Sequence, residues 1–590
     1  MLESSATTPR EGAGAIHGDR APRHKKRAET ALASDGQNAT AESGPQEPSP
    51  REPAPLAESS SSGEAAVPEV SPDRGAPPGG EIELKLLVDA DRLAGFNTAP
   101  VIVANARNKG SRKHLKSAYF DTSERILRRS GLSLRVRQSG ARFVQTVKAD
   151  FADDPLRRGE WETGVSSMTP DIALAMPFIP AKLRADLMRD GLEEVFTTDI
   201  RRHARLVDLP AGTVEVAFDH GVLKSGDRSM PVSEIELELK SGSAGTIYEL
   251  ALRLLDHGPL KPSIRSKSAR GFDLADDTPP AARRPRKLRL DSSISLDEAF
   301  ATILRGCLRH LLESLPAAED GRDPEGVHQL RVALRRLRSA LGLMRSVGPL
   351  SQLDLLRAEA QWLAQNLSAA RDWDIFEGET LPTVAKACPT VAGFDVLKEA
   401  TSKRRQAAYR KVHLALGDIR CARFLIGLGG WIEARGWRSG EVAPENLGRL
   451  AEPATSFAGE ALSAQHAKVL KRGRHFKSLS VDELHRLRLA AKKLRYVADF
   501  LLPLYEDRKA VKQFSRKLAG LQEELGCYND MAVTASLLDG LTADSSESGT
   551  AGAVIVGWQA HASIGIAPRL RSAWRDFTKA KTPWSRALEG

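Results

Sequence analysis

The chain changes its hydrophobic period near residue 280, and this change constrains the fold more than any other feature. Between residues 81 and 280, apolar and polar residues alternate in several segments, which is the period of strands with two different faces. From residue 291 onward, apolar residues such as Leu330, Leu334 and Leu337 recur three and four positions apart, as in amphipathic helices. We therefore expect a multidomain α+β protein, in which a β-rich region precedes an all-α region.

Two segments outside these regions have a biased composition. Residues 1–80 contain 11 prolines and no aromatic residue, so they cannot bury enough apolar surface to offset the entropy of ordering them. We predict a disordered tail there, and interpret its basic cluster at 23–27 as a solvated run, with a nuclear or nucleic-acid signal as the alternative. Residues 281–290 carry five basic and no acidic residues and are predicted to be a basic linker.

Charge and cysteine content exclude several classes of protein. The formal net charge is +10, and most of this excess lies in residues 291–590. The four cysteines form no C-x-x-C pair, which argues against a disulfide framework or a zinc ribbon. The N-terminus lacks a secretory pattern, and the longest stretch without charged residues, 549–568, is too polar to span a membrane. We expect a cytoplasmic protein with no membrane partner.

Charged residues form rows on one face of the predicted strands. Glu81, Glu83 and Lys85 alternate with Ile82 and Leu84. Other rows place together Arg135 with Arg137, Thr146 with Lys148, Glu160 with Glu162, Glu215 with Asp219, and Glu234 with Glu236, Glu238 and Lys240. Contact with water explains any single row, but six such strands favour a barrel of about eight strands with a charged interior. Because cations bind phosphate oxygens and glutamates bind hard divalent metals, the rows predict a phosphate chain with Mg²⁺ or Mn²⁺.

These segments resemble the CYTH superfamily, also called triphosphate tunnel metalloenzymes. The E-x-E-x-K signature of the family is present at residues 81–85. Other family blocks follow in order at 119–122, 134–137, 146–148, 158–162, 234–240 and 266–271. The resemblance implies an antiparallel eight-stranded tunnel that hydrolyses the terminal phosphoanhydride bond of a triphosphate with Mg²⁺ or Mn²⁺. Members include inorganic triphosphatases, thiamine triphosphatases and a class of adenylate cyclase.

The resemblance also implies roles for individual residues. The implied catalytic residues are Lys85, Glu81 and Glu83, where Lys85 serves as a phosphate clamp or as a proton partner of the attacking water. The implied metal ligands, or holders of metal-bound water, are Glu81, Glu83, Glu160, Glu162, Glu215, Asp219, Glu236 and Glu238. The implied phosphate-binding residues are Lys85, Arg135, Arg137, Lys148, Lys240, Lys267 and Arg270. Arg201, Arg202 and Arg205 compete for one further arginine position, for which we choose Arg202 and Arg205.

The helical region contains an internal repeat. Residues 328–338 return as 485–495, and residues 367–374 return as 525–532, so the two copies keep almost the same register. This spacing predicts a duplicated bundle of about four helices per half. The two pseudo-repeats are expected at about 291–440 and 450–590.

Each copy of the repeat places four basic residues on one helix face. The first basic row is His328, Arg331, Arg335 and Arg338, and the second basic row is His485, Arg488, Lys492 and Arg495. Like charges at these spacings repel one another, which destabilises a helix unless an anion lies opposite. A solvated basic face explains one such row, whereas two equivalent rows favour an anion site.

This half resembles the CHAD domain, a conserved histidine α-helical domain that is often fused to CYTH. The resemblance rests on the helix H-x-L-R-x-x-x-[RK]-[RK]-L-R and the segment R-D-x-D, and it implies binding of inorganic polyphosphate along a basic channel. Binding of DNA or RNA would call for aromatic platforms interleaved with the basic residues, and aromatic residues are only 5% of the chain, so we do not expect a nucleic-acid partner. The predicted function is metal-dependent hydrolysis of inorganic triphosphate or a related triphosphate, with polyphosphate as a second partner and polyphosphate granules as a location. The alternative is a non-catalytic polyphosphate-binding protein.

Overall fold

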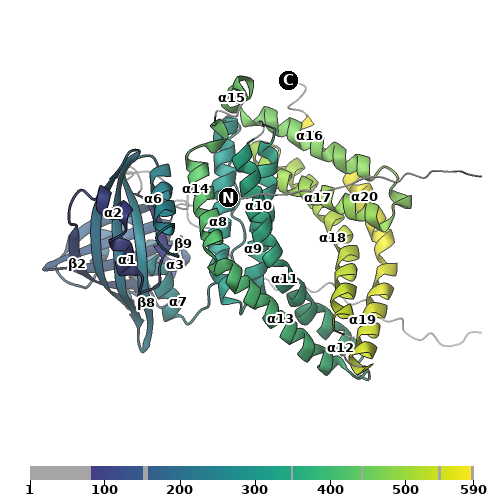
Figure 1. Ribbon diagram of the computed structural model, residues 1–590, viewed down its shortest axis with the longest axis horizontal. Helices are drawn as coiled ribbons and strands as arrows, with labels where there is room; N and C mark the ends of the chain where they lie inside the picture. Colours follow the sequence, from purple (N-terminus) through teal and green to yellow (C-terminus); the bar gives the residue numbers. More distant parts are fainter. Residues whose placement is uncertain are drawn as a thin grey trace, which may run out of the picture. The chain divides into compact units, whose positions relative to one another are not determined.

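The computed structural model describes residues 81–150, 157–346, 348, 350–439, 443–541 and 546–585. The predicted disordered tail, residues 1–80, lies outside the described residues. Within them, an antiparallel sheet occupies the first part of the chain and helices occupy the second part (Figure 1). The predicted α+β organisation is confirmed.

Eight strands form a closed antiparallel ring. The strands are β1 (Glu81–Leu87), β2 (Ser111–Asp121), β3 (Leu132–Ser139), β4 (Arg142–Asp150), β5 (Arg157–Val165), β6 (Glu193–Leu209), β7 (Gly212–Ser225) and β8 (Arg228–Gly242). The order β5-β4-β3-β2-β6-β7-β8-β1 closes because β1 also pairs with β5. We call these eight strands the strand ring. The sheet has nine strands rather than the predicted eight, because a short ninth strand, β9 (Lys261–Ser263), pairs with the second half of β1.

The strand ring has apolar residues outside and charged residues inside. Outward residues of β1, β7 and β8, such as Leu84, Val216 and Leu237, pack against α1 (Leu93–Asn97), α2 (Pro100–Asn105) and α6 (Gly245–Leu255). On the other side, β3 and β4 pack against α3 (Ile126–Arg129), α4 (Ile172–Ala175) and α5 (Ala181–Asp190). Because neighbouring side chains in a strand point to opposite faces, this packing turns the alternate charged residues inward. Each charged row therefore faces the interior of the ring.

The second part of the chain is a duplicated helical region. The first half contains α8 (Leu296–Asp320), α9 (Pro324–Met344), α10 (Ser351–Asn366), α11 (Ser368–Ile375), α12 (Leu381–Ala387), α13 (Phe394–Gly417) and α14 (Ile419–Glu433). The short α15 (Pro444–Ala451) precedes the second half, which contains α16 (Ala454–Arg472), α17 (Val481–Leu501), α18 (Arg508–Asp539), α19 (Ser546–Ile564) and α20 (Ile566–Thr578). Among the described residues, each half thus has five helices of 13 residues or more, compared with the prediction of about four.

The two copies of the repeated helix, α9 and α17, have the same length and begin at equivalent residues. Asp323 caps α9, and Ser480 caps α17 with a side chain that accepts from the backbone N–H of Glu483. The halves differ in the next element. The first half is interrupted at Leu367 and by a π-helical turn, Phe376–Thr380, whereas α18 runs through the corresponding segment without a break.

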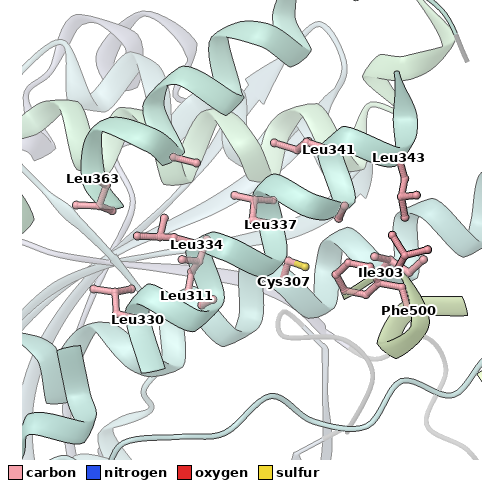
Figure 2. Packing of buried hydrophobic residues seen from close by; sticks show 14 of the residues in the cluster. Ile303, Cys307, Leu311, Leu330, Leu334, Leu337, Leu341, Leu343, Leu363 and Phe500 are labelled. Carbon is pink, nitrogen blue, oxygen red and sulfur yellow. The ribbon is translucent and has the colours of Figure 1, made fainter. Parts of the chain in front are cut away.

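Both halves of the helical region share one apolar core. Leu330, Leu334, Leu337 and Leu341 of α9 are fully buried and pack with residues of α8 and α10. Figure 2 shows these leucines beside Ile303, Cys307 and Leu311 of α8, Leu363 of α10 and Phe500 of α17. Because Phe500 belongs to the second half, the pseudo-repeats pack as one unit.

Two further features bear on the expectations from sequence. No disulfide bond joins any of the four cysteines; Cys307 and Cys421 are buried, and Cys388 and Cys527 are partly exposed. Among the described residues, no helix combines the length and the apolar character that crossing a membrane requires.

Candidate active site

A cluster of buried ion pairs lies inside the strand ring. Lys267, from α7 (Lys267–Ala275), donates to Glu234 and lies 2.6 Å from Asp219 and 3.1 Å from Glu236. Arg202 of β6 donates to both oxygens of Asp219 at 2.7 and 2.6 Å and also to Glu236. We call Asp219, Glu234, Glu236, Arg202 and Lys267 the inner ion cluster. It joins three strands and one helix, and its two cations form ion pairs with all three of its carboxylates.

Ion pairs within the inner ion cluster shift the pKa values of four of its members, and each shift favours the charged form. Burial opposes ionisation of Glu236, but Lys267, Arg202 and Lys85 hold its pKa well below the usual value. Burial likewise opposes ionisation of Asp219, and Lys267 and Arg202 outweigh it, so that pKa is also lowered. In return, the carboxylates raise the pKa values of Lys267 and Arg202 against the effect of burial.

Three glutamates form a row across neighbouring strands at the next level of the ring. Glu238 of β8 lies directly opposite Glu215 of β7 on one side and Glu83 of β1 on the other. Residues opposite each other in an antiparallel sheet have Cβ atoms about 5 Å apart, and like charges there destabilise the sheet. We call Glu83, Glu215 and Glu238 the carboxylate row. Lys85 donates to Glu83 and lies 3.7 Å from Glu236, so it connects this row to the inner ion cluster.

A second group of charges lies on β3, β4 and β5. Arg135 is 3.1 Å from Glu160, and Lys148 is 2.5 Å from the other oxygen of the same carboxylate. Glu162 is 3.8 Å from Arg135, but 56% of its side chain is exposed. Tyr119 lies opposite Arg135; burial opposes its ionisation, yet Arg135 and Arg137 lower its pKa. Glu160 is therefore the carboxylate that anchors this group.

Arg137 differs from the other interior cations. Its Nε donates to Ser117 Oγ at 3.1 Å, and within the described chain it forms no ion pair with a carboxylate. Burial and the neighbouring charge of Arg135 lower the pKa of Arg137 to about 10. Desolvation of a guanidinium that has no ion-pair partner costs free energy, and an anion that binds to it removes that penalty. Arg137 is therefore a half-buried cation for which the described residues supply no carboxylate within ion-pair distance.

Helix α7 closes one end of the ring interior and carries two of the predicted phosphate-binding residues. Its N-cap Ser266 precedes Lys267, and Arg270 donates to Glu234. A Cβ atom on Gly271 would lie 2.1 Å from the ring of Phe196, so only glycine permits this close contact between α7 and β6. Leu274 of α7 packs against an apolar layer inside the ring made by Leu115, Ile200, Leu223 and Val232. This layer keeps water away from that end of the charged interior.

The remaining predicted residues of the ring occupy different positions. Lys240 is 38% exposed and donates to Glu238, so it lies at the edge of the carboxylate row. The strand register corrects the prediction that Arg205 binds phosphate together with Arg202. Arg205 lies three residues from Arg202 in an unbroken strand, and residues three apart in a strand point to opposite faces. Arg205 therefore does not share the inward face of Arg202. Glu81 begins β1, but its side chain lies outside the described residues.

Sequence reasoning missed Glu234 as a site residue. It is fully buried and forms ion pairs with Lys267 and Arg270, which makes it a central member of the inner ion cluster. The alternation along β8 already placed it on the same face as Glu236 and Glu238. That pattern was the signal that it belongs to the interior.

Two sets of carboxylates are candidate ligands for a divalent metal ion. Carboxylate oxygens of Asp219, Glu234 and Glu236 all lie within 4.8 Å of one another, but the Lys267 ammonium group contacts all three and takes the central position. The carboxylate row is the second set: its three glutamates occupy facing positions on adjacent strands, and carboxylate oxygens are the donors that Mg²⁺ and Mn²⁺ prefer. Among the described residues, only the first set already has its oxygens within 4.8 Å of one another, so the side chains of the row would have to converge to bind an ion.

In the helical region, the first basic row lies half-buried along α9. Arg331 donates to Ala364 O at 3.0 Å and to Ser368 Oγ at 2.7 Å, and Arg338 donates to Gln361 at 3.1 Å. Burial and the charges of Arg371, Arg335 and Arg331 lower the pKa of His328. The members of the row therefore interact electrostatically with one another and with Arg371.

The second basic row is more open. His485 and Arg495 are exposed, Arg488 and Lys492 are half-buried, and Arg495 donates to Gln522 at 3.1 Å. Further basic residues, which sequence analysis did not single out, lie where the two halves approach each other. Partial desolvation and the charges of Lys468, Arg357 and Arg345 lower the pKa of Lys493. Because Arg357 and Arg345 belong to the first half, basic groups of both halves lie close together.

A closed antiparallel ring with a charged interior, followed by a duplicated helical region with two basic rows, defines the class of the protein. The CYTH domain family matches residues 80–272, and the CHAD domain family matches residues 302–539. The chain therefore belongs to the proteins that combine a CYTH domain with a CHAD domain.

Several known proteins are similar to this chain. An inorganic triphosphatase of Haemophilus influenzae is 28% identical over 195 residues, which cover 32% of this chain and 54% of the relative. The chain thus spans about half the length of this relative. An uncharacterized protein of Mycobacterium tuberculosis is 25% identical over 416 residues, covering 65% of this chain and 75% of the relative. The crystal structure of the CHAD domain from the plant Ricinus communis is 31% identical, covers 51% of this chain and 98% of its own, and has a TM-score of 0.45.

Proposed function

We propose that the strand ring binds inorganic triphosphate or a related triphosphate and hydrolyses its terminal phosphoanhydride bond with a divalent metal ion. The observation that carries this proposal is Arg137, a half-buried cation that donates to a hydroxyl group and has no ion-pair partner among the carboxylates of the described chain. The carboxylate row faces the same interior. Similarity to an inorganic triphosphatase supports the same reaction.

The proposed roles follow from the positions of the side chains. Arg137, Arg135 and Lys148 bind phosphate oxygens, and Arg135 and Lys148 do so in competition with Glu160. Glu83, Glu215 and Glu238 would hold Mg²⁺ or Mn²⁺. When bound, such an ion neutralises phosphate oxygens and lowers the pKa of a water molecule. Lys85, between Glu83 and Glu236, orients both carboxylates and acts as a phosphate clamp or as the proton partner of the attacking water.

Phosphate release from tripolyphosphate by the full chain tests the enzymatic function. We expect activity with Mg²⁺ or Mn²⁺ and none in EDTA, and Glu83→Gln or Glu238→Gln should lower the rate by about a hundredfold or more. Glu249→Gln, on the outer helix α6, is the matched control and should retain the wild-type rate. Wild-type rates in both ring variants would refute the assignment. Tight binding of tripolyphosphate without turnover by the wild type would instead favour the non-catalytic alternative.

For the helical region we propose binding of inorganic polyphosphate along the two basic rows. The supporting observation is that Arg335, in the middle of the first row, has a buried Nε without a hydrogen-bond partner in the described chain. A flexible polyanion with one charge per phosphate can follow both rows, and its binding should release counterions and weaken steeply with salt. We also propose residues 81–280 and 291–590 as the domain limits, joined by the basic linker 281–290.

Titration of the full chain with long-chain polyphosphate, in EDTA, tests this second function. The triple substitution Arg331→Ala, Arg335→Ala and Arg338→Ala should weaken binding more than Arg488→Ala, Lys492→Ala and Arg495→Ala. The three substituted residues of the first row are half-buried and all arginine, whereas the second set contains Lys492, and arginine binds phosphate oxygens in a bidentate fork that lysine cannot form. Equal losses in both variants, together with equal competition by DNA, would reduce the proposal to a general basic surface.

A further inference from the structure

A cavity of about 700 Å³ lies between α20 and the turn that joins α16 to α17. Its lining contains two aromatic residues, Phe476 from the 3₁₀ turn Phe476–Ser478 and Trp574 from α20. None of its lining residues belongs to the strand ring or to either basic row. The proposed functions above therefore leave this cavity unexplained.

The two aromatic residues form a fixed platform. Their rings stack with centroids 4.9 Å apart and planes 7° apart. A Cβ atom on Gly473 would lie 2.1 Å from the indole of Trp574, so the absence of a side chain there lets the indole lie against the backbone. Trp574 also contacts Phe577, which is fully buried. The platform is thus anchored in the core and does not depend on flexible surface side chains.

Basic residues surround the platform. Arg474 and Lys477 flank Phe476 in the sequence, and Arg571 and Arg575 lie on the same face of α20 as Trp574 because of their helical spacing. In the described part of the chain, none of these four side chains forms an ion pair, and no carboxylate lines the cavity. Arg575 donates to Ser572 Oγ at 3.4 Å. Because the lining contains four exposed cations and no carboxylate, the cavity favours an anionic ligand over a neutral or cationic one.

We propose that this cavity binds a nucleoside di- or triphosphate. The base stacks against the Phe476–Trp574 platform, and the phosphates bind the guanidinium and ammonium groups of Arg474, Lys477, Arg571 and Arg575. The volume lies within the range of small-molecule sites and fits a single nucleotide. An inorganic phosphate chain would use the cations but would leave the aromatic platform without a partner.

The test is photo-crosslinking of the full chain with 8-azido-adenosine triphosphate in EDTA, which prevents metal-dependent hydrolysis. Peptide mapping locates the label, and competition by unlabelled adenosine triphosphate measures affinity at that position. We expect label within residues 474–478 or 571–575. Tripolyphosphate should compete about tenfold less well than adenosine triphosphate, because it cannot stack.

Substitutions of Phe476 test whether the base stacks on the aromatic platform. Phe476→Leu should weaken nucleotide binding about tenfold, whereas Phe476→Tyr, which keeps an aromatic ring, should restore it. Trp558→Leu is the matched control, because Trp558 is an exposed aromatic residue on α19 outside the cavity. Polyphosphate binding and triphosphate hydrolysis should not change in any of the three variants, so failure here is distinguishable from failure of the proposed functions.

Four outcomes would overturn the inference. They are label confined to the strand ring or the basic rows, equal competition by tripolyphosphate, unchanged affinity in a folded Phe476→Leu variant, and tighter binding of a single-stranded oligonucleotide than of the mononucleotide. The last outcome would identify the cavity as part of a nucleic-acid interface.

Discussion

Arg202 and Asp219 lie directly opposite each other on β6 and β7 and form a bidentate ion pair inside the strand ring, with N–O distances of 2.7 and 2.6 Å. Asp219→Asn would leave Arg202 and Lys267 buried without this counter-charge. Removing one partner of a buried pair costs about 3–5 kcal/mol. We therefore expect a large drop in the midpoint of urea unfolding of the full chain.

The matched control for this prediction is Asp208→Asn. Asp208 also pairs with an arginine, Arg107, but about half of each side chain is exposed. Exposed ion pairs contribute little to stability, so the midpoint should hardly move. Equal shifts in the two variants would show that the Arg202–Asp219 pair has no special role in the stability of the ring.

Gly271→Ala should damage the site without removing a charged group. The new Cβ atom would overlap the ring of Phe196, and overpacking of this kind costs about 1–3 kcal/mol. Because α7 carries Lys267 and Arg270, its displacement should also weaken triphosphate binding, measured by isothermal titration calorimetry. Gly164→Ala on β5, where nothing lies within 4 Å of the added Cβ atom, should leave both properties intact.

Arg137→Met should affect stability and ligand binding in opposite directions. Loss of a half-buried cation that has no ion-pair partner among the carboxylates of the described chain should leave stability unchanged or raise it, because the penalty for desolvating the charge disappears. Affinity for tripolyphosphate should fall about tenfold or more, because a charge-assisted bond to phosphate is lost. Arg112→Met, at an exposed position of β2, should change neither quantity. A loss of stability without a loss of affinity would assign Arg137 a structural role.

The inner ion cluster predicts a specific response to acid. The folded pKa of Glu236 is below its unfolded value, so its stabilising contribution is complete above the unfolded pKa of about 4 and is lost as the pH falls toward the folded pKa. The stability difference between wild type and Glu236→Gln should therefore be constant from about pH 8 to 5 and shrink below about pH 4.5. Urea unfolding at a series of pH values measures this difference.

Asp121 supplies a control with the opposite sign. Burial raises its pKa even though its carboxylate accepts from three backbone N–H groups, those of Thr122, Leu127 and Arg128. Its contribution is therefore complete below the unfolded pKa and is lost as the pH rises through the folded pKa. The difference between wild type and Asp121→Asn should shrink with rising pH. The same direction in both variants would contradict the assigned charge states.

The charged rows could be predicted from sequence because the direction of a side chain in a strand is a local property. Alternation along β8 was enough to place Glu236 and Glu238 on one face, and the same rule should have rejected Arg205 as a partner of Arg202. Helical spacing was equally sufficient for the first basic row. These features depend on residues that are neighbours in the chain.

Features that depend on packing between distant segments could not be predicted. Alternation along β8 could place Glu234 on the inward face, but its ion pairs with Lys267 and Arg270 could not be predicted, because α7 brings these residues from another part of the chain. The Phe476–Trp574 platform brings together two residues far apart in sequence, and neither is unusual in its own segment. The ninth strand was missed because three residues show no measurable period.

The closure of the strand ring is uneven. In the described chain, β1 joins β5 through two residue pairs, Glu81↔Arg158 and Ile82↔Arg157, whereas β7 and β8 pair from Gly212 to Ser225. Opening a short ladder breaks few backbone hydrogen bonds, so this seam should open far more often than the rest of the ring. In hydrogen–deuterium exchange, amides at the start of β1 should lose protection first and those of β7 and β8 last. A cylinder closed in this way can open along the β1–β5 seam while the long ladders between its other strands stay paired.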